Sequence, residues 1–373
     1  MKIGFDATSL CRKITGIESY TLNLLKTVMK TDLKNEYIVL FRKEIHPDIA
    51  PFKNKARFFI CPSNNQIACE QIWIPLALKK ESVDLVHFPA FPPGFFINTK
   101  FVMTLHDATM WRYANTLSWK NKLYMKPLCN IAIRRAEKII TVSESSKKDL
   151  VEFCDIYDSK IVNTSESISD NFKVIESKSY LEKIKIKHNL PDKFILSVCS
   201  LEPRKNLLIL LEAYAKFKKI APNVSHKLVL VGRKAWGSDA VAKIISKLNI
   251  GTEVKVIGHV IIDDLVGIYN LTDLFVYPSI YEGFGLPPLE AMACGVPVIA
   301  SNTSSMPEVL DDAAILTDPH DSDQIANKMA EVLTDSGLKI KLKEKGLERV
   351  KNFSWDKVAE KTLNVYETIK YGS

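Results

Sequence analysis

Two glutamates eight positions apart, in a segment rich in glycine and proline, are the residues best suited to chemistry. Glu282 stands in an expected loop, and Glu290 in what we expect to be the first turn of the following helix. The glycines of Gly283-Phe284-Gly285 let the backbone approach a ligand closely. A loop that enters a helix presents N–H groups to anions, while carboxylates accept hydrogen bonds from hydroxyls. The segment 281–295 therefore predicts a site for a ligand that carries both phosphates and sugar hydroxyls.

Each glutamate alone has a plainer interpretation, as a solvated loop acid or as a charge that favours the helix dipole. The pattern around them favours the functional interpretation. Pro287 and Pro288 fit a first helical turn, where a missing N–H is no loss. Gly295 fits the position that ends a helix, and an apolar strand follows it.

A basic pair forms the second candidate group. Arg204 and Lys205 follow the expected strand Phe194–Val198 and precede the expected helix Leu207–Lys219, with Asn206 as its expected N-cap. A strand end beside a helix start is where a diphosphate would be held, by the planar fork of arginine and the point charge of lysine. A surface basic pair is the alternative.

Alternating strands and helices must position these groups. The first half is expected to hold strands at Lys2–Asp6, Tyr37–Phe41, Arg57–Ile60, Asp84–His87, Lys100–Leu105 and Lys138–Val142. The second half is expected to hold them at Phe194–Val198, Lys227–Val231, Glu253–Ile257, Leu274–Tyr277, Pro297–Ala300 and Ala313–Leu316. Helical stretches between them include Ser19–Lys30 and Asp239–Leu248. This alternation predicts two doubly wound α/β domains with parallel sheets.

Composition and charge agree with a folded two-domain protein. The chain has 373 residues, of which 46% are hydrophobic and 25% charged. Its net charge of +8 suits anionic partners without choosing among them. Seven scattered cysteines without C-x-x-C spacing predict reduced thiols. We expect a cytoplasmic protein, because neither a signal peptide nor a membrane-spanning run is seen.

The domain boundary is expected in the polar run Glu176–Pro191. The predicted domains are residues 1–180 and 190–352, each Rossmann-like, with residues 356–373 forming a last helix.

The two motifs together resemble glycosyltransferase family 4. The second half matches closely from Ser197 to Leu316, with Glu282…Glu290 as the family's E-x7-E element. Weaker matches in the first half are Asp6-Ala-Thr…Thr15-Gly-Ile-Glu-Ser-Tyr20, Thr104-Leu-His-Asp107 and Thr141-Val-Ser-Glu-Ser-Ser-Lys147, and Phe353-Ser-Trp355 near the end is similar to the start of the family's last helix. The resemblance implies the GT-B fold, two facing Rossmann-like domains with a cleft between them. It also implies that the last helix packs back on an acceptor-binding first domain.

The resemblance implies a role for each matching residue. Glu282 would hold the donor sugar, Glu290 the ribose, and Arg204 with Lys205 the diphosphate. Ser200 stands where many members carry an arginine, and Arg204 would supply that charge. The catalytic residues would be His106, Arg204, Lys205 and Glu282. The remaining donor-binding residues would be Gly16 in the first domain, and Ser200, Gly258, His259, Val260, Gly283, Phe284, Gly285 and Leu286 in the second.

The implied activity is the retaining transfer of a hexose from a nucleotide sugar, GDP-mannose-like or a UDP-sugar, to a glycan or lipid-linked acceptor of bacterial polysaccharide synthesis. In this family no metal is required, and a donor phosphate oxygen takes the acceptor's proton. Alternatives are another GT-B enzyme, such as an epimerase or phosphorylase, or a non-catalytic binder of nucleotide sugars. An NAD-dependent oxidoreductase is disfavoured because Pro288 stands where a third glycine would complete G-x-G-x-x-G. No motif supports nucleic-acid binding.

A basic stretch interspersed with aromatic residues, Trp111–Lys138, is the last feature. It suits a surface that meets anionic lipid headgroups at the inner face of the cell membrane. Equally, it suits a first-domain helix with aromatic residues in the core and solvated lysines.

Overall fold

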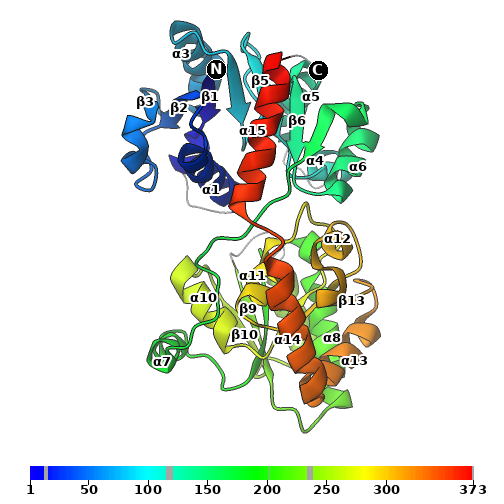
Figure 1. The fold of residues 1–373 in the computed structure, drawn as a ribbon. Helices are drawn as coiled ribbons and strands as arrows, with labels where there is room; N and C mark the ends of the chain where they lie inside the picture. The colour runs from blue at the N-terminus through cyan, green and yellow to red at the C-terminus, as the bar shows by residue number, and fades with distance from the viewer. Residues whose placement is uncertain (12–15, 115–120, 201, 233–237, 372–373) are drawn as a thin grey trace. The chain divides into compact units, whose positions relative to one another are not determined.

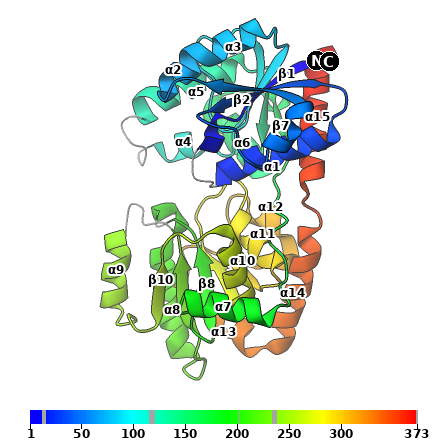
Figure 2. The same cartoon turned by 90° about the vertical axis from the view of Figure 1, so that its left-hand side faces the viewer.

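The computed structural model describes residues 1–11, 16–114, 121–200, 202–232 and 238–371. The chain divides into two compact units, each built on its own parallel sheet (Figure 1). The first unit comprises Met1–Ser167 and Ser354–Ser373, and the second comprises Ile168–Phe353. The division precedes the polar run in which the sequence analysis expected it. That run forms α7 (Lys178–Lys187), which packs against α10 (Ile262–Leu271) of the second unit (Figure 2).

Seven parallel strands form the sheet of the first unit, in the order β3-β2-β1-β4-β5-β6-β7. The strands are β1 (Lys2–Asp6), β2 (Glu36–Arg42), β3 (Ala56–Cys61), β4 (Leu85–Phe88), β5 (Lys100–Thr104), β6 (Lys138–Thr141) and β7 (Ile161–Asn163). The helices are α1 (Gly16–Thr31), α2 (Gln66–Ala68), α3 (Ile74–Lys80), α4 (Thr109–Arg112), α5 (Lys126–Arg135), α6 (Glu144–Cys154) and α15 (Trp355–Tyr371). The order reverses between β1 and β4.

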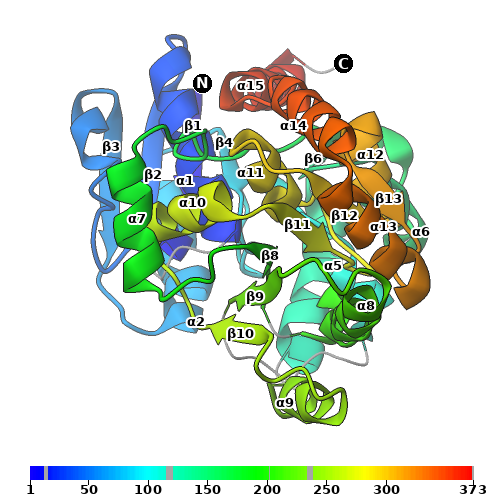
Figure 3. The ribbon, with the colours of Figure 1, turned by 90° about the horizontal axis from the view of Figure 1, so that it is seen from below.

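Six parallel strands form the sheet of the second unit, in the order β10-β9-β8-β11-β12-β13 (Figure 3). They are β8 (Phe194–Val198), β9 (Lys227–Val231), β10 (Val254–Ile257), β11 (Leu274–Tyr277), β12 (Val298–Ser301) and β13 (Ile315–Thr317). The other helices are α8 (Leu207–Ile220), α9 (Ser238–Lys247), α11 (Leu286–Ala293), α12 (Met306–Leu310), α13 (Ser322–Thr334) and α14 (Ser336–Val350). Here the order reverses between β8 and β11.

Burial on both faces explains the composition of the strands. Strands β8, β9 and β11 are continuous apolar runs because helices cover both sides of the sheet. In Figure 3, α10 and α11 lie on one side of the second sheet, and α8 and α9 on the other. The described residues thus confirm the predicted α/β class with two parallel sheets.

The last helix completes the first unit. Helix α15 lies along α1 (Figure 1). The ring of Trp355 meets that of Tyr20 edge-on at 5.7 Å between centroids. The hydroxyl of Tyr366 lies 2.6 Å from Nδ1 of the buried His87, whose Nε2 lies 2.8 Å from Oγ1 of Thr104.

Candidate active site

The loops after β8 and β11 lie at the point where the strand order of the second sheet reverses. In open α/β sheets, ligands bind outside the carboxyl ends of the strands at this point. A hydrogen bond joins the loops, since the amide of Ile280 donates to the carbonyl oxygen of Arg204 at 2.8 Å. The basic pair and the glutamate-containing loop therefore form one site.

The carboxylate of Glu282 is the centre of this site, and its side chain is buried. Its Oε1 accepts hydrogen bonds from Lys205 Nζ (2.5 Å), the Tyr277 hydroxyl (2.8 Å) and Ser279 Oγ (2.6 Å). Its Oε2 accepts one from Arg204 Nη1 (3.2 Å). The sequence analysis assigned Glu282 to the donor sugar. The structure shows that it holds both predicted cations, and Oε2 is the oxygen with fewer donors.

Opposing effects set the pKa of Glu282. Burial alone would raise it, but the charges of Lys205 and Arg204, and the hydrogen bonds from Lys205 and Ser279, outweigh burial and lower the pKa to about 2. Glu282 is thus ionised throughout the physiological range. Two of the three ammonium hydrogens of Lys205 are used by Glu282 and Tyr277 (2.9 Å). Lys205 has no third acceptor among the described residues, so one strong donor remains for an anion.

A second carboxylate, absent from the predicted site, orients Arg204. Glu202 accepts from Nε of Arg204 at 3.1 Å and from Oγ of Ser200 at 2.7 Å. Ser200 therefore joins the predicted group through Glu202. The guanidinium of Arg204 also donates to the carbonyl oxygen of Tyr281 at 3.1 Å, which ties it to the β11 loop.

The predicted N-cap role of Asn206 is wrong. Its backbone is left-handed (φ 59°), and no side-chain cap is made to α8. Instead its Nδ2 donates to the carbonyl oxygens of Pro278 (3.1 Å) and Pro319 (2.5 Å). Asn206 thus ties three loops together, because two nearby carbonyls compete with the helix end for its amide.

The start of α11 has the predicted shape. Gly285 precedes it in a left-handed conformation (φ 111°), and prolines stand in its first positions. After its end, Gly295 is left-handed (φ 73°), and its amide donates to the carbonyl oxygen of Met292 at 2.9 Å. No side-chain cap covers the amino end. Pro287 and Pro288 have no N–H, so the amides of Gly285 and Leu286 are the ones that suit an anion.

Glu290 lies in the second turn of α11 and not in the first, because the helix begins at Leu286. Its Oε2 accepts a hydrogen bond of 2.9 Å from the hydroxyl of Tyr269 on α10. Burial raises the pKa of Glu290 to about 7, although the hydrogen bond from Tyr269 opposes the shift. Among the described residues it makes no hydrogen bond to the Glu282 group.

Hydroxyl side chains after β12 hold the β11 loop in place, and the sequence analysis missed them. Ser305 Oγ donates to the carbonyl oxygens of Glu282 (3.0 Å) and Phe284 (2.7 Å). Ser304 Oγ accepts from the amide of Glu282 at 3.0 Å, and Thr303 Oγ1 donates to the carbonyl oxygen of Ile280 at 2.9 Å. The run of hydroxyl residues Thr303-Ser304-Ser305, just after a strand, was the sequence feature that could have predicted these hydrogen bonds.

The predicted base-binding segment follows β10. Gly258 and His259 are exposed and Val260 is buried, and α10 begins two residues later. An added Cβ at Gly258 would meet no atom within 4 Å, so this backbone is open to a ligand.

The first unit carries the other two predicted residues. Gly16 is exposed at the start of α1, and Tyr20, one turn later, packs edge-on against the ring of His106 (4.6 Å between centroids). Burial lowers the pKa of His106, although a hydrogen bond to Pro89 and the charges of Asp107 and Glu18 oppose it. Its Nε2 lies 3.1 Å from the carbonyl oxygen of Pro89. Since a carbonyl only accepts, the proton of the neutral ring lies on Nε2. Thr15 lies outside the described residues.

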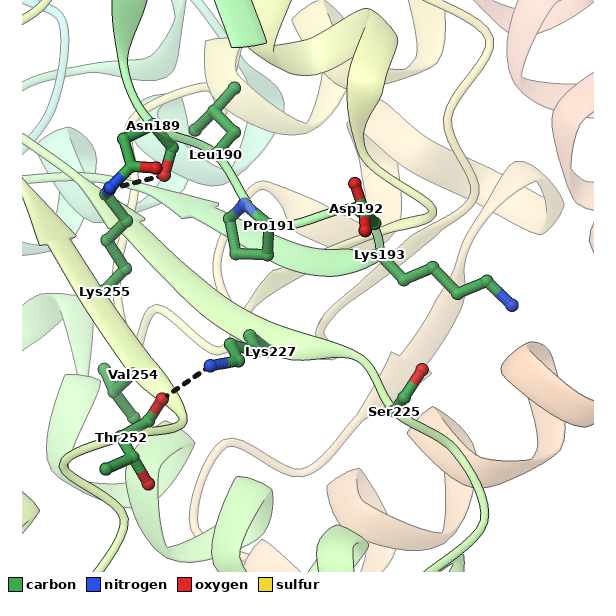
Figure 4. A pocket seen from close by; sticks show the side chains of 10 residues that line it. All are labelled: Asn189, Leu190, Pro191, Asp192, Lys193, Ser225, Lys227, Thr252, Val254 and Lys255. Carbon is green, nitrogen blue, oxygen red and sulfur yellow. Dashed lines mark hydrogen bonds between the residues drawn. The ribbon is translucent and has the colours of Figure 1, made fainter. Parts of the chain in front are cut away.

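Another hollow lies at the opposite, amino edge of the second sheet (Figure 4). Lys255 Nζ donates to the carbonyl oxygen of Asn189 at 2.6 Å, and Lys227 Nζ to that of Thr252 at 2.9 Å. Because parallel sheets bind ligands at their carboxyl edge, this hollow is not part of the candidate site. The described residues contain no group of three or more His, Cys, Asp or Glu side chains arranged to hold a metal ion.

Part of the basic aromatic stretch packs against the core of the first unit. Trp111 packs against the apolar core, and its Nε1 donates to Asn130. Arg112 pairs with Asp149 at 3.0 Å. Helix α5 buries one face, whose residues are Leu128, Cys129, Ala132 and Ile133. Residues 115–120, which include Trp119 and Lys120, lie outside the described residues.

Known proteins match the chain over both units. The sequence model described as "Glycosyltransferase Family 4" matches residues 14–162, and that described as "Glycosyl transferases group 1" matches residues 181–349. O-antigen chain mannosyltransferase B of Escherichia coli is 31% identical, with 99% of this chain and 100% of that protein covered. The serotype-specific mannosyltransferase WbdA of Escherichia coli is 32% identical over 68% of this chain and 31% of its own length.

Solved structures share the fold. HepE of Anabaena, solved with UDP and glucose, superposes with a TM-score of 0.74 at 18% identity, over 99% of this chain and 100% of that one. WaaG, a glycosyltransferase involved in lipopolysaccharide biosynthesis, gives 0.71 at 16% identity, over 98% and 99%. The fold is thus that of the GT-B enzymes, and the chain belongs to glycosyltransferase family 4.

Proposed function

We propose that this protein transfers a mannosyl residue from a nucleoside-diphosphate sugar to a glycan or lipid-linked acceptor during bacterial surface-polysaccharide synthesis. The observation that carries the proposal is a pair of cations, the buried Lys205 and the partly exposed Arg204, both held by Glu282 at the point where the strand order reverses. The mannosyltransferase relative that spans the whole chain supports mannose as the sugar. GDP-mannose is favoured as donor, with a UDP-sugar as the alternative.

In this proposal the leaving diphosphate is stabilised by fixed charges. As the bond between the sugar C1 and the phosphate oxygen breaks, negative charge grows on the diphosphate. The remaining donor of Lys205, the guanidinium of Arg204 and the uncapped amino end of α11 would accept that charge without reorganising. The scheme uses no metal ion.

Retention of configuration is the second part of the proposal. The acceptor oxygen would bond to C1 on the face that the phosphate leaves, and its proton would pass to a phosphate oxygen of the leaving group. The neutral ring of His106, with its proton on Nε2, is assigned to a hydroxyl of the donor sugar and not to proton transfer. Glu290 and the backbone at 258–260 would hold the ribose and the base.

Product analysis tests this function. We expect the protein, incubated with GDP-mannose and an alkyl mannoside, to release GDP and form an α-linked disaccharide, identified by the C1–H1 coupling in NMR spectra. A β-linked product would contradict the retaining scheme. Binding of nucleotide sugars without transfer or donor hydrolysis would instead indicate a non-catalytic binder, and a thermal-shift screen of nucleotides would detect such binding.

Nucleoside diphosphates are expected to bind more tightly as the pH rises through about 7, the pKa of Glu290. A protonated Glu290 must release its proton before it can accept two ribose hydrogen bonds. The pKa of Glu290 in the folded protein, about 7, lies above its ordinary value of 4.5. The folded protein therefore holds this proton more tightly than the unfolded chain does. The free energy of unfolding should fall as the pH rises from about 4.5 to about 7.

Calorimetry with GDP and UDP on both sides of that pH would measure the effect on binding. The phosphate itself titrates near pH ~6, so Glu290→Gln serves as the matched control for that contribution. Equal pH dependence in the two proteins would contradict the role of Glu290.

We also propose that the first unit docks on anionic lipid at the cytoplasmic face of the membrane. The docking surface that we propose differs from the basic stretch expected from the sequence. It consists of exposed apolar side chains, namely Ile72 (60% exposed), Leu76 (61%), Phe96 (67%) and Leu123 (73%). Gln71 ties these segments together, since it accepts from the amide of Phe95 at 2.8 Å and donates to the hydroxyl of Tyr124 at 2.9 Å. Lys79 and Lys80 end α3 beside them, as lipid headgroups would require. None of the helices described is long and apolar enough to cross a membrane.

Vesicle sedimentation tests the docking surface. We expect binding to phosphatidylglycerol vesicles that weakens at high salt and is lost in the double variant Leu76→Ser, Phe96→Ser. Leu33→Ser is the control, because Leu33 is an even more exposed apolar side chain (85%) that lies between α1 and β2. Failure of the wild-type protein to bind at low salt would reject the proposal.

A further inference from the structure

A buried tyrosine on α10 contacts the glutamate that the proposed function assigns to the ribose. The side chain of Tyr269 is fully buried, and its hydroxyl donates to Oε2 of Glu290 at 2.9 Å. Glu290 itself is only partly buried. Its other oxygen, Oε1, has no hydrogen-bond donor among the described residues. One carboxylate oxygen is therefore held by the protein, and the other is left for a ligand.

Aromatic side chains fix the ring of Tyr269. Between centroids, it lies 5.5 Å from the ring of Phe275 on β11 and 5.9 Å from that of Phe172. Phe275 in turn stacks at 5.9 Å on Tyr277, the tyrosine whose hydroxyl donates to Glu282. Phe275 and Tyr277 are two positions apart on one strand, so they share the face of the sheet on which α10 and α11 lie (Figure 3). A ring packed in this way holds its hydroxyl in one place.

The hydroxyl of Tyr269 has one hydrogen and two acceptors. Besides Glu290, it lies 3.3 Å from the carbonyl oxygen of Pro287 in the first turn of α11. An ionised carboxylate is the stronger acceptor, so it takes the hydrogen when Glu290 is charged. A protonated Glu290 can instead donate to the hydroxyl, whose own hydrogen then turns to Pro287. The tyrosine can thus hold the same carboxyl oxygen in both protonation states.

Glu290 is the group of this cluster that titrates near neutral pH. Burial of its carboxyl group raises its pKa to about 7, and the hydrogen bond from Tyr269 opposes that rise. Burial raises the pKa of Tyr269 well above its ordinary value, and that of Cys294 at the end of α11 to about 12. Both groups are therefore neutral where Glu290 changes its charge. Helix α14 also packs on α11, but its Lys343 lies beside Gly295, and its charge does not shift the pKa of Glu290.

We propose that Tyr269 is a positioning residue of the donor site, whose hydroxyl holds Oε2 of Glu290 so that Oε1 accepts hydrogen bonds from the ribose of a nucleoside diphosphate. The inference rests on the proposed function and deepens it, because it names the group that aims the ribose-binding carboxylate. The same hydroxyl favours the charged form of Glu290. Without it, Glu290 would keep its proton to a higher pH and its carboxylate would turn freely.

Nucleotide binding to Tyr269→Phe tests the inference, because this variant loses one oxygen and keeps the ring. The probes are GDP and dideoxy-GDP, which lacks both ribose hydroxyls, titrated by calorimetry over a range of pH. Above pH ~7 we expect the wild-type protein to prefer GDP by roughly 10- to 100-fold, as hydrogen bonds to a charged group do. Tyr269→Phe should lose most of this preference. The pH at which GDP binding strengthens should also rise, by about one unit.

Three further variants separate positioning from general stability. Tyr214→Phe is the matched control, because Tyr214 is also fully buried in the second unit and its hydroxyl donates to the carbonyl oxygen of His226 at 2.9 Å. It should change neither the preference nor the pH dependence. In the background of Glu290→Gln, Tyr269→Phe should have no further effect on either quantity. Fluorotyrosine at position 269, with fluorine next to the hydroxyl, keeps the ring and is a stronger donor, so it should move the transition to lower pH.

Opposite pH shifts in the two variants of Tyr269 would support the inference, since a loosened fold would move both in the same direction. The inference would be overturned by an unchanged preference and an unchanged pH dependence in Tyr269→Phe, or by a wild-type protein that binds GDP and dideoxy-GDP equally well. A wild-type protein that binds neither GDP nor UDP would overturn the proposed function together with the inference.

Discussion

Replacement of Lys205 by alanine should lower kcat/KM by a factor on the order of 10² to 10³, as removal of one charge-stabilising donor does in other enzymes. The side chain is buried, and its ammonium is held between Glu282 (2.5 Å) and the hydroxyl of Tyr277 (2.9 Å). Its remaining donor acts mainly when charge develops on the leaving diphosphate, so the loss should fall on kcat more than on KM for the donor. Release of nucleoside diphosphate measures both parameters.

A control must separate lost chemistry from lost folding, because Lys205→Ala leaves the carboxylate of Glu282 with one cation fewer. Breaking a buried ion pair costs about 3–5 kcal/mol of folding stability. The double variant Lys205→Met, Glu282→Gln removes both charges, and we expect it to regain stability but not activity. Lys216→Ala, which breaks an exposed pair with Asp323 on the same unit, should change neither. Near-normal turnover in Lys205→Ala would refute its assigned role.

Replacement of Gly285 by alanine should destabilise the second unit by about 2–6 kcal/mol and abolish donor binding. The backbone there has φ 111°, which costs a side chain about 1–3 kcal/mol. The new Cβ would also lie 2.2 Å from Cε of Met306, and overpacking of this kind costs about 1–3 kcal/mol more. Relief of the contact would move the start of α11, whose N–H groups are proposed to face the phosphates.

Two further variants sharpen this prediction. Gly251→Ala is the matched control, since its added Cβ would meet only Ile245 at an ordinary 4.0 Å. Met306 is fully buried, so Met306→Ala alone leaves a cavity and is the reference for the double variant. Measured against Met306→Ala, the change Gly285→Ala should cost only the backbone part of the loss. Urea denaturation and GDP titration measure stability and binding. If Gly285→Ala matched Gly251→Ala in both, the left-handed backbone would not be needed.

Most strands could be predicted from the sequence, because a strand that is buried on both faces of a sheet appears as a short apolar run. Strands β8, β9 and β11 occupy the residues predicted for them, each a short apolar run between polar residues. Strand β7 (Ile161–Asn163) was missed, because it has only two apolar residues, Ile161 and Val162, with Lys160 before them and Asn163 after them. The parallel class followed from the alternation with helices.

Sequence spacing predicted that three candidate residues lie together, and it did not predict the hydrogen bonds among them. Spacing placed Arg204, Lys205 and Glu282 after neighbouring strands, where topology brings them together. It did not show that Glu282 would hold the two cations, since that depends on where two loops cross. For the same reason it gave Asn206 a capping role, although two carbonyls from other loops take its amide.

The packing of α15 on the first unit sets an order in time during biosynthesis. The ring of the buried His87 on β4 meets the Tyr366 hydroxyl at 2.6 Å, and that tyrosine leaves the ribosome only after all of residues 168–353. The second unit is one uninterrupted segment and can fold as it emerges. The first unit is translated earlier. Until α15 emerges, the face of α1 that it covers stays exposed, and the ring of His87 lacks its hydrogen bond with Tyr366. The part of the chain that is made first is therefore finished last.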